Sequence, residues 1–319
     1  MRAVFVDASE TLAAVARRLL RPDDPPFAIH ADPGITPQDL PAILDGAEIA
    51  VIDHTALPGD VARACAGLKH VVFLGTGARS YMDPEALAAE RGIAVHTIKG
   101  YGDTAVAECA FALMWAAARG LPEMDRAMRV GSWLRTEGIQ LTGKTVGLVG
   151  FGGIAAEMAR LCRGIGMRVL AWNRTKRTHP DVAFVALEHL LAESDVVSLH
   201  LLLTDETRGF LSAARIAAMK PGAMLINTAR GAVLDQDALA EATGTGRLRA
   251  ILDVTDPEVL PPEHPLWTDE NVLITPHLAG SQGNELRRLA ELAVAEVTRW
   301  VAGQPFAHPV RRERLGLIA

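Results

Sequence analysis

The sequence predicts an α/β protein with two doubly wound parallel-sheet domains. Three observations support this fold class: apolar runs of strand length alternate with helical patterns, the runs fall into two series, and a glycine-rich turn connects a strand to a helix in the second series. Strands buried on both faces of a parallel sheet have this near-continuous apolar character. The 319 residues suffice for two domains with well-buried cores.

The apolar runs place the expected strands in chain order. The first series lies at residues 2–6, 49–52, 70–74 and 93–95, and the second at 145–149, 168–172, 195–199, 223–227, 249–253 and 271–274. Two helices with regular apolar stripes are also expected, one capped by Asp103 and one over residues 286–301, before Gly303 and Pro305. We interpret both stripes as core packing.

Composition and charge argue against several classes of protein. The net charge of −6 is spread along the chain without a basic block, so we expect neither nucleic acid nor a membrane as partner. No apolar run approaches the length of a membrane span, and residues 1–7 resemble a first strand rather than a signal peptide. Cys65, Cys109 and Cys162 are far apart and lack metal-ligand spacing, so we expect no metal and a cytoplasmic protein with reduced thiols.

The turn GFGGIA at residues 150–155 indicates a dinucleotide-binding site. Gly150 permits a tight turn after the strand, and Gly152 lets the backbone approach a pyrophosphate. The helix that begins at Gly153 and Ile154 offers free N–H groups and the positive end of its dipole to the anion. Such a motif is weak alone, but the strand–turn–helix context and a second strand at the right distance favour dinucleotide binding.

The stretch RVLAWNRTKR at residues 168–177 bears on cofactor choice. It follows the glycine turn by about twenty residues, where an acidic residue usually holds the adenosine ribose. Asn173 stands there instead, which removes the repulsion of a 2′-phosphate. Arg174 can meet that phosphate with a charge-assisted fork, and Thr175 adds a hydroxyl. The stretch predicts that NADP is preferred and NAD is possible; the alternative is a solvated basic loop.

Five ordered motifs extend this interpretation: LTGKTVGLVGFGGIA, DVVSLHLLLTDETRGFL (195–211), KPGAMLINTARGAVLDQDAL (220–239), LDVTDPE (252–258) and ITPHLAGS (274–281). Together they resemble the D-isomer-specific 2-hydroxyacid dehydrogenases. The resemblance implies a flavodoxin-like substrate domain formed by residues 1–100 and 283–319. It implies a Rossmann domain for the dinucleotide, residues 101–282, inserted into it, with the active site in the cleft. It also implies a homodimer with the 103–120 helix at the interface.

Reduction of a 2-oxo acid needs a grip on the carboxylate, polarisation of the carbonyl and a proton for the developing alkoxide. Arg230 suits the first two tasks because its planar guanidinium offers a fixed fork. His277 suits the proton donor, and Glu258 would hydrogen-bond its ring, orienting it and favouring its protonated form. The alternatives are a surface arginine, a structural histidine and a solvated carboxylate. We prefer the catalytic roles because the other motifs accompany these residues.

The resemblance implies further contacts. Cofactor contacts are expected at Thr207, Thr228, Ala229, Arg230, Asp253, His277 and Gly280, with Asp253 at the nicotinamide amide. Backbone N–H groups of Gly75, Thr76 and Gly77 can hold the substrate carboxylate together with Arg230 and His277. Arg79 is interpreted either as a second anion site or as a surface arginine. We interpret His200 as a strand-end residue near the cofactor.

These observations predict NAD(P)H-dependent reduction of a small 2-oxo acid, glyoxylate-like or hydroxypyruvate-like, to the D-2-hydroxy acid, or the reverse oxidation. Phosphoglycerate dehydrogenase-like activity is the rival inside the family. A non-enzymatic, dinucleotide-sensing regulator on the same fold is the rival from another class, since fold alone does not determine function.

Overall fold

The computed structural model describes residues 2–20, 26–75, 77–98, 100–280, 291–299 and 304. The chain divides into two compact units, which are described separately below. Unit 1 comprises Met1–Tyr101 and Gln282–Ala319, and unit 2 comprises Gly102–Ser281. Thr76 and most of the expected 283–319 segment lie outside the described residues.

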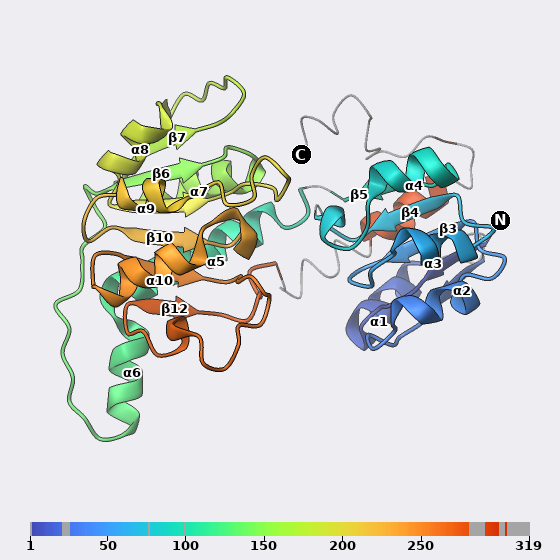
Figure 1. Ribbon diagram of the computed structural model, residues 1–319, viewed down its shortest axis with the longest axis horizontal. Helices are drawn as coiled ribbons and strands as arrows, with labels where there is room; N and C mark the ends of the chain where they lie inside the picture. The colour runs from blue at the N-terminus through green and yellow to red at the C-terminus, as the bar shows by residue number, and fades with distance from the viewer. Residues whose placement is uncertain are drawn as a thin grey trace. The chain divides into compact units, whose positions relative to one another are not determined.

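Unit 1 is built on a five-stranded parallel sheet with the order β2-β1-β3-β4-β5 (Figure 1). Its strands are β1 (Ala3–Phe5), β2 (Phe27–Ile29), β3 (Ile49–Ile52), β4 (His70–Phe73) and β5 (Ala94–Thr97). Its helices are α1 (Glu10–Leu19), α2 (Leu40–Ile43), α3 (Gly59–Ala64) and α4 (Pro84–Arg91), with 3-10 turns at Pro37–Asp39 and Ala78–Ser80. This strand order is flavodoxin-like.

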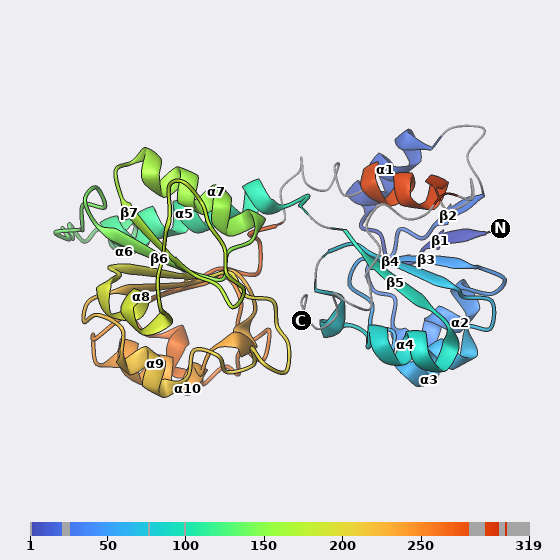
Figure 2. The ribbon, with the colours of Figure 1, turned by 90° about the horizontal axis from the view of Figure 1, so that it is seen from above.

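Helices cover both faces of this sheet (Figure 2). On one face, Phe5 of β1 and Leu12 of α1 share a core with Ala293 and Val297 from the helical segment at residues 291–299. On the other face α2, α3 and α4 pack over a second core. The chain therefore returns to unit 1 after passing through unit 2, because residues beyond 290 complete the N-terminal core.

Unit 2 carries a seven-stranded parallel sheet with the order β12-β11-β10-β9-β6-β7-β8. Its strands are β6 (Thr145–Val149), β7 (Arg168–Trp172), β8 (Ala183–Phe184), β9 (Val196–Leu199), β10 (Met224–Asn227), β11 (Arg249–Leu252) and β12 (Val272–Ile274). The order reverses between β6 and β9. In open α/β sheets ligands bind at the carboxyl edge beside such a reversal. The predicted fold class, a Rossmann domain within a flavodoxin-like domain, is confirmed.

Two layers of helices enclose the unit 2 sheet (Figure 2). One face is covered by α5 (Asp103–Arg119) and α7 (Gly153–Gly164), and the other by α8 (Leu187–Glu193), α9 (Ala213–Ala217) and α10 (Gln236–Gly244). The short α6 (Leu121–Arg129) follows α5 directly, and 3-10 turns lie at Gly231–Val233 and Pro265–Trp267. Of the stripe that the sequence predicts for α5, Ala110 and Met114 are fully buried, and the other positions are partly buried: Val106, Cys109, Leu113 and Ala117.

Within the described ranges, no single helix is long and apolar enough to cross a membrane. Only α5 and α6 taken together reach that length and composition, and they are bent by 63° at their junction.

Candidate active site

The glycine turn after β6 forms an open cradle at the carboxyl edge of the unit 2 sheet. Gly150 adopts a φ of +87°, and a Cβ there would lie 2.6 Å from the carbonyl oxygen of His200. Only glycine fits this position without strain. A Cβ at Gly152 would meet no atom within 4 Å. The backbone before α7 therefore faces free space, which is the geometry that a pyrophosphate needs.

The basic stretch after β7 is tied to this turn. The Phe151 N–H donates to Asn173 Oδ1 at 2.9 Å, and Asn173 Nδ2 donates to both the carbonyl and the hydroxyl oxygen of Thr175 at 2.9 Å. The Arg174 guanidinium forms an ion pair with Glu206. Asn173 and Thr175, which are predicted to contribute to cofactor preference, are thus held beside the glycine turn. Arg174, the third residue with this predicted role, has an acidic neighbour.

Two buried polar atoms at the same edge have no hydrogen-bond partner among the described residues: His200 Nε2, directly after β9, and Thr228 Oγ1, directly after β10. Burial lowers the pKa of His200 to about 4, so its ring is neutral at pH 7. A buried polar group without a partner costs roughly 1–3 kcal/mol, so such atoms commonly receive their partner from a ligand or water. These orphan atoms and the open cradle fit a nicotinamide dinucleotide.

Arg230 lies in the turn after β10, and a buried asparagine braces this turn. Asn227 Nδ2 donates to the Arg230 carbonyl at 2.8 Å, and Asn227 Oδ1 accepts from the Ala229 N–H at 3.0 Å. The Arg230 guanidinium donates to the Ala229 carbonyl at 2.6 Å. Asn227 is fully buried, and residue type alone did not single it out. Its place inside the NTARG motif was the available signal.

His277 follows β12 in a tight turn that Asp253 shapes. His277 has a φ of 49°, and it is the one described non-glycine residue with a positive φ. The Asp253 carbonyl accepts from the His277 N–H at 2.9 Å. The buried Asp253 carboxylate accepts from the Thr275 hydroxyl at 2.6 Å and from the N–H groups of Leu278 and Ala279 at 3.0 and 2.9 Å. Both carboxylate oxygens thus already hold this turn, and the contact of Asp253 with the nicotinamide stays a prediction.

The structure brings Glu258 and His277 into direct contact. The Glu258 carboxylate Oε1 and the His277 ring Nδ1 form a hydrogen bond, although both side chains remain partly exposed, at 58% and 41%. A carboxylate can only accept here, so Nδ1 carries the proton and Nε2 is left to exchange a proton with another molecule. Arg230 lies at the same sheet edge, because β10, β11 and β12 are parallel neighbours.

The loop that presents Glu258 is clamped by Gln236 at the start of α10. Gln236 Nε2 donates to the Asp256 carbonyl at 2.9 Å, and the Asp256 N–H donates back to Gln236 Oε1 at 3.1 Å. The Thr255 hydroxyl donates to the Glu258 carbonyl at 2.8 Å. A side chain at Gly231 would collide with the Thr255 backbone, so glycine allows this close approach.

Two of the remaining predicted cofactor residues also shape local backbone. Thr207 Oγ1 donates to the Leu202 carbonyl at 2.5 Å and accepts from the Thr204 N–H at 2.8 Å, which closes the loop after β9. Gly280 ends the described part of unit 2, and a Cβ there would lie 3.9 Å from Val106 of α5. Neither contact tests the predicted roles in cofactor binding.

The predicted substrate loop belongs to unit 1 and lies after β4. The Gly75 N–H donates to the Phe73 carbonyl at 2.9 Å, because the chain turns sharply there, so this N–H is already used. Gly77 immediately precedes the 3-10 turn at Ala78–Ser80, and Thr76 lies outside the described residues. Arg79 forms an ion pair with Glu85 at the start of α4. In this conformation Arg79 is a paired surface arginine.

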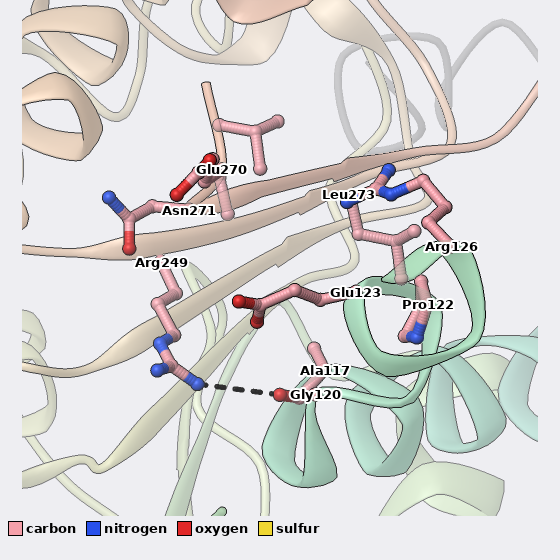
Figure 3. A pocket seen from close by; sticks show the side chains of 11 residues that line it. Ala117, Gly120, Pro122, Glu123, Arg126, Arg249, Glu270, Asn271 and Leu273 are labelled. Atoms are coloured by element: carbon pink, nitrogen blue, oxygen red, sulfur yellow. Dashed lines mark hydrogen bonds between the residues drawn. The ribbon is translucent and has the colours of Figure 1, made fainter. Parts of the chain in front are cut away.

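Unit 2 has a pocket at the opposite, amino edge of its sheet (Figure 3). Residues of α5 and α6, including Glu123 and Arg126, line it together with Arg249 at the start of β11 and with Glu270 and Asn271 before β12. In the parallel sheet this position is a strand length away from the carboxyl edge that carries Arg230 and His277. The pocket is therefore separate from the candidate active site.

Comparisons with known proteins agree with this geometry. The sequence profile of the D-isomer specific 2-hydroxyacid dehydrogenase, NAD binding domain, matches residues 111–279. The chain is 39% identical over 228 residues to a glyoxylate reductase of Korarchaeum cryptofilum, which covers 68% of this chain and 69% of that protein. It is 35% identical over 269 residues to a D-3-phosphoglycerate dehydrogenase of Archaeoglobus fulgidus, covering 82% of this chain but only 51% of that protein.

The fold is also similar to solved structures. The structure of the TT0316 protein from Thermus thermophilus superposes with a TM-score of 0.85 at 36% sequence identity, covering 98% of this chain and 100% of that chain. The superposed region includes both sheets and thus the edge on which Arg230, Glu258 and His277 lie.

Proposed function

The chain belongs to the D-isomer specific 2-hydroxyacid dehydrogenase family, and we propose that it reduces a small 2-oxo acid, such as glyoxylate or hydroxypyruvate, to the D-2-hydroxy acid. Family membership makes it a nicotinamide-dependent oxidoreductase. The observation that carries the proposed roles of individual residues is the Glu258–His277 contact at the edge that also bears Arg230.

The proposed mechanism assigns one task to each of these side chains. The glycine turn would hold the dinucleotide, which would supply the hydride when bound. Arg230 binds the substrate carboxylate and polarises the carbonyl oxygen with its guanidinium. His277 Nε2 donates a proton to the developing alkoxide. Glu258 holds Nδ1–H, which fixes the ring orientation and stabilises the positive charge of the imidazolium before transfer.

The proposed substrate class is supported by the relatives, together with the two side chains assigned to the substrate, Arg230 and His277. The relatives include glyoxylate reductases, one of which is matched over 69% of its length. The D-3-phosphoglycerate dehydrogenase is matched over only about half of its length, which gives weaker support for a phosphorylated substrate. A non-enzymatic regulator would not need the Glu258–His277 pair and Arg230 at one edge.

A panel of 2-oxo acids tests this proposal. We expect oxidation of NADH or NADPH, followed by absorbance, with glyoxylate or hydroxypyruvate and much less with 3-phosphohydroxypyruvate. Chiral analysis of the hydroxypyruvate product should return the D-isomer. A preference for the phosphorylated acid would reject the substrate assignment, and absence of turnover with every acid would favour the regulator.

We also propose that NADP is the preferred cofactor and that the enzyme acts in the cytoplasm. The first proposal is supported by Asn173 and Arg174 beside the glycine turn. The second is supported by Cys65, Cys109 and Cys162, which are free thiols in the structure, a state typical of a reducing compartment.

The protein is proposed to form a homodimer with α5 at the interface, as the resemblance implies, and with the α5–α6 arm, defined as residues 115–134, as part of that interface. This arm gathers most of the exposed large apolar side chains of the described residues: Trp115, Leu121, Met128, Val130, Trp133 and Leu134. In Figure 1, α6 and the segment after it extend beyond the body of unit 2. Exposed apolar side chains gathered on one segment favour an interaction surface there. A second copy of the chain is the proposed occupant.

Replacement of Trp133 by serine is expected to shift the protein from dimer to monomer at micromolar concentration, because this side chain is 76% exposed and would be buried by the partner. Sedimentation velocity measures the change. Trp267→Ser is the matched control, because Trp267 is also exposed, at 47%, but lies outside the arm. A wild-type chain that sediments as a monomer would contradict the proposal.

A further inference from the structure

The first residue of α5 lies against the first residue of α7. A Cβ built at Gly153 would overlap the Asp103 carboxylate, at 2.5 Å from Cγ and 3.1 Å from Oδ1. No side chain larger than hydrogen fits at Gly153 while Asp103 keeps this position. The second glycine of the GG pair in GFGGIA is thus explained by Asp103, in addition to any approach of the cofactor.

This carboxylate occupies a region with a strong preference for negative charge. α7 has 12 residues and begins at Gly153, and the first-turn N–H groups and the dipole of a helix favour an anion at that end. The pyrophosphate of a dinucleotide uses the same helix end in a Rossmann fold. Asp103 therefore places a carboxylate at the helix end where the family's cofactor brings two negative charges.

We propose that Asp103 is an internal competitor of the cofactor pyrophosphate, which weakens dinucleotide binding and speeds release of the spent cofactor. The inference rests on the proposed use of the glycine turn. Like charges within a few ångströms repel strongly at a partly buried site, and the repulsion is present only when the dinucleotide is bound. The carboxylate must move aside or tolerate the pyrophosphate, and either event reduces affinity.

The test compares Asp103→Asn with Glu108→Gln. Asparagine keeps the size and helix-starting ability of aspartate and removes only its charge. Glu108 is an exposed carboxylate on the same helix, so its replacement removes the same charge away from Gly153. We expect Asp103→Asn to lower the Kd of NADH and NADPH about tenfold, as measured by fluorescence titration, and Glu108→Gln to leave it unchanged. Asp103→Ser provides a second neutral variant should the asparagine protein fold poorly.

Simpler probes localise the effect. The Kd of ADP-ribose, which contains the pyrophosphate, should fall by the same factor in Asp103→Asn. The Kd of adenosine, which lacks the pyrophosphate, should not change. Raising the salt concentration from about 0.01 M to about 1 M should shrink the gain, because salt screens the repulsion. Unchanged or weaker NADH binding by both neutral variants would overturn the inference. Failure of the wild-type protein to bind either dinucleotide would instead reject the proposed use of the glycine turn.

Discussion

Replacement of His277 or Arg230 is expected to lower kcat for the 2-oxo acid by two or more powers of ten and to change the Kd of the dinucleotide much less, because most of the expected cofactor contacts come from the glycine turn and from other residues. In the proposed mechanism His277 delivers the proton and Arg230 holds the charge that develops on the substrate, so both would act mainly in the transition state. Loss of one such group typically costs about 10²-fold or more in rate.

The local backbone determines the best variants for this test. His277 has a φ of 49°, a conformation that asparagine tolerates better than alanine, so His277→Asn separates loss of the imidazole from strain in the turn. Arg230→Ala leaves the Asn227 brace intact, because Asn227 contacts only backbone atoms of the Arg230 turn. Comparison of His277→Ala with His277→Asn therefore measures how much of the loss is conformational.

Steady-state kinetics and fluorescence titration of NADPH measure the two expected effects. His189→Asn and Arg160→Ala serve as controls, because both residues are exposed on helices of unit 2 away from the carboxyl edge. Near-wild-type turnover of both His277 variants would show that another group delivers the proton. A parallel loss of NADPH binding would show that the residues act on the cofactor instead.

The sequence located ten of the strands to within about two residues, because strands buried on both faces are written as continuous apolar runs. It missed β2 and β8, each of which is an edge strand of its own sheet. β2 has three residues, all only partly buried. β8 has only two residues, and β2 is enclosed by the stretches RPDDPP (21–26) and HADP (30–33), whose prolines and polar residues are typical of a loop. The positions of both strands follow from pairing with β1 and β7, which is a tertiary effect.

In the candidate site, too, local sequence patterns predict some features, whereas others depend on tertiary contacts. Residue chemistry and the family resemblance predict Arg230, Glu258 and His277 as site residues, and the structure places the last two in contact. Spacing does not reveal which side chains hold the loops that carry these residues. Gln236 clamps the backbone of Asp256 through its amide, a contact between residues twenty positions apart that another polar side chain on α10 could equally have made. Such contacts depend on the loop path, which the sequence does not encode as a local pattern.

Cofactor preference depends on two side chains with different roles. Asn173 Oδ1 accepts from the Phe151 N–H, and an aspartate could keep this bond while offering its second oxygen to the ribose hydroxyls. Arg174 is paired with Glu206, so a 2′-phosphate must share the guanidinium with this carboxylate or displace it. Lys176 and Arg177 are exposed and add positive potential nearby.

The unmodified enzyme is expected to use NADPH more efficiently than NADH by about tenfold to a hundredfold in kcat/KM, mainly through KM, because a charged hydrogen bond contributes roughly 1.5–3 kcal/mol. Asn173→Asp combined with Arg174→Gln should abolish or reverse this preference, since the new carboxylate repels the 2′-phosphate and the cation is gone. Glu206→Gln should increase the preference for NADPH, because the Glu206 carboxylate would no longer compete with the 2′-phosphate for Arg174. The opposed responses separate specific recognition from a general basic loop, in which removal of Glu206 or of Arg174 would change both cofactors alike. Equal or better efficiency with NADH in the unmodified enzyme would refute the assignment of Asn173 and Arg174 to the 2′-phosphate.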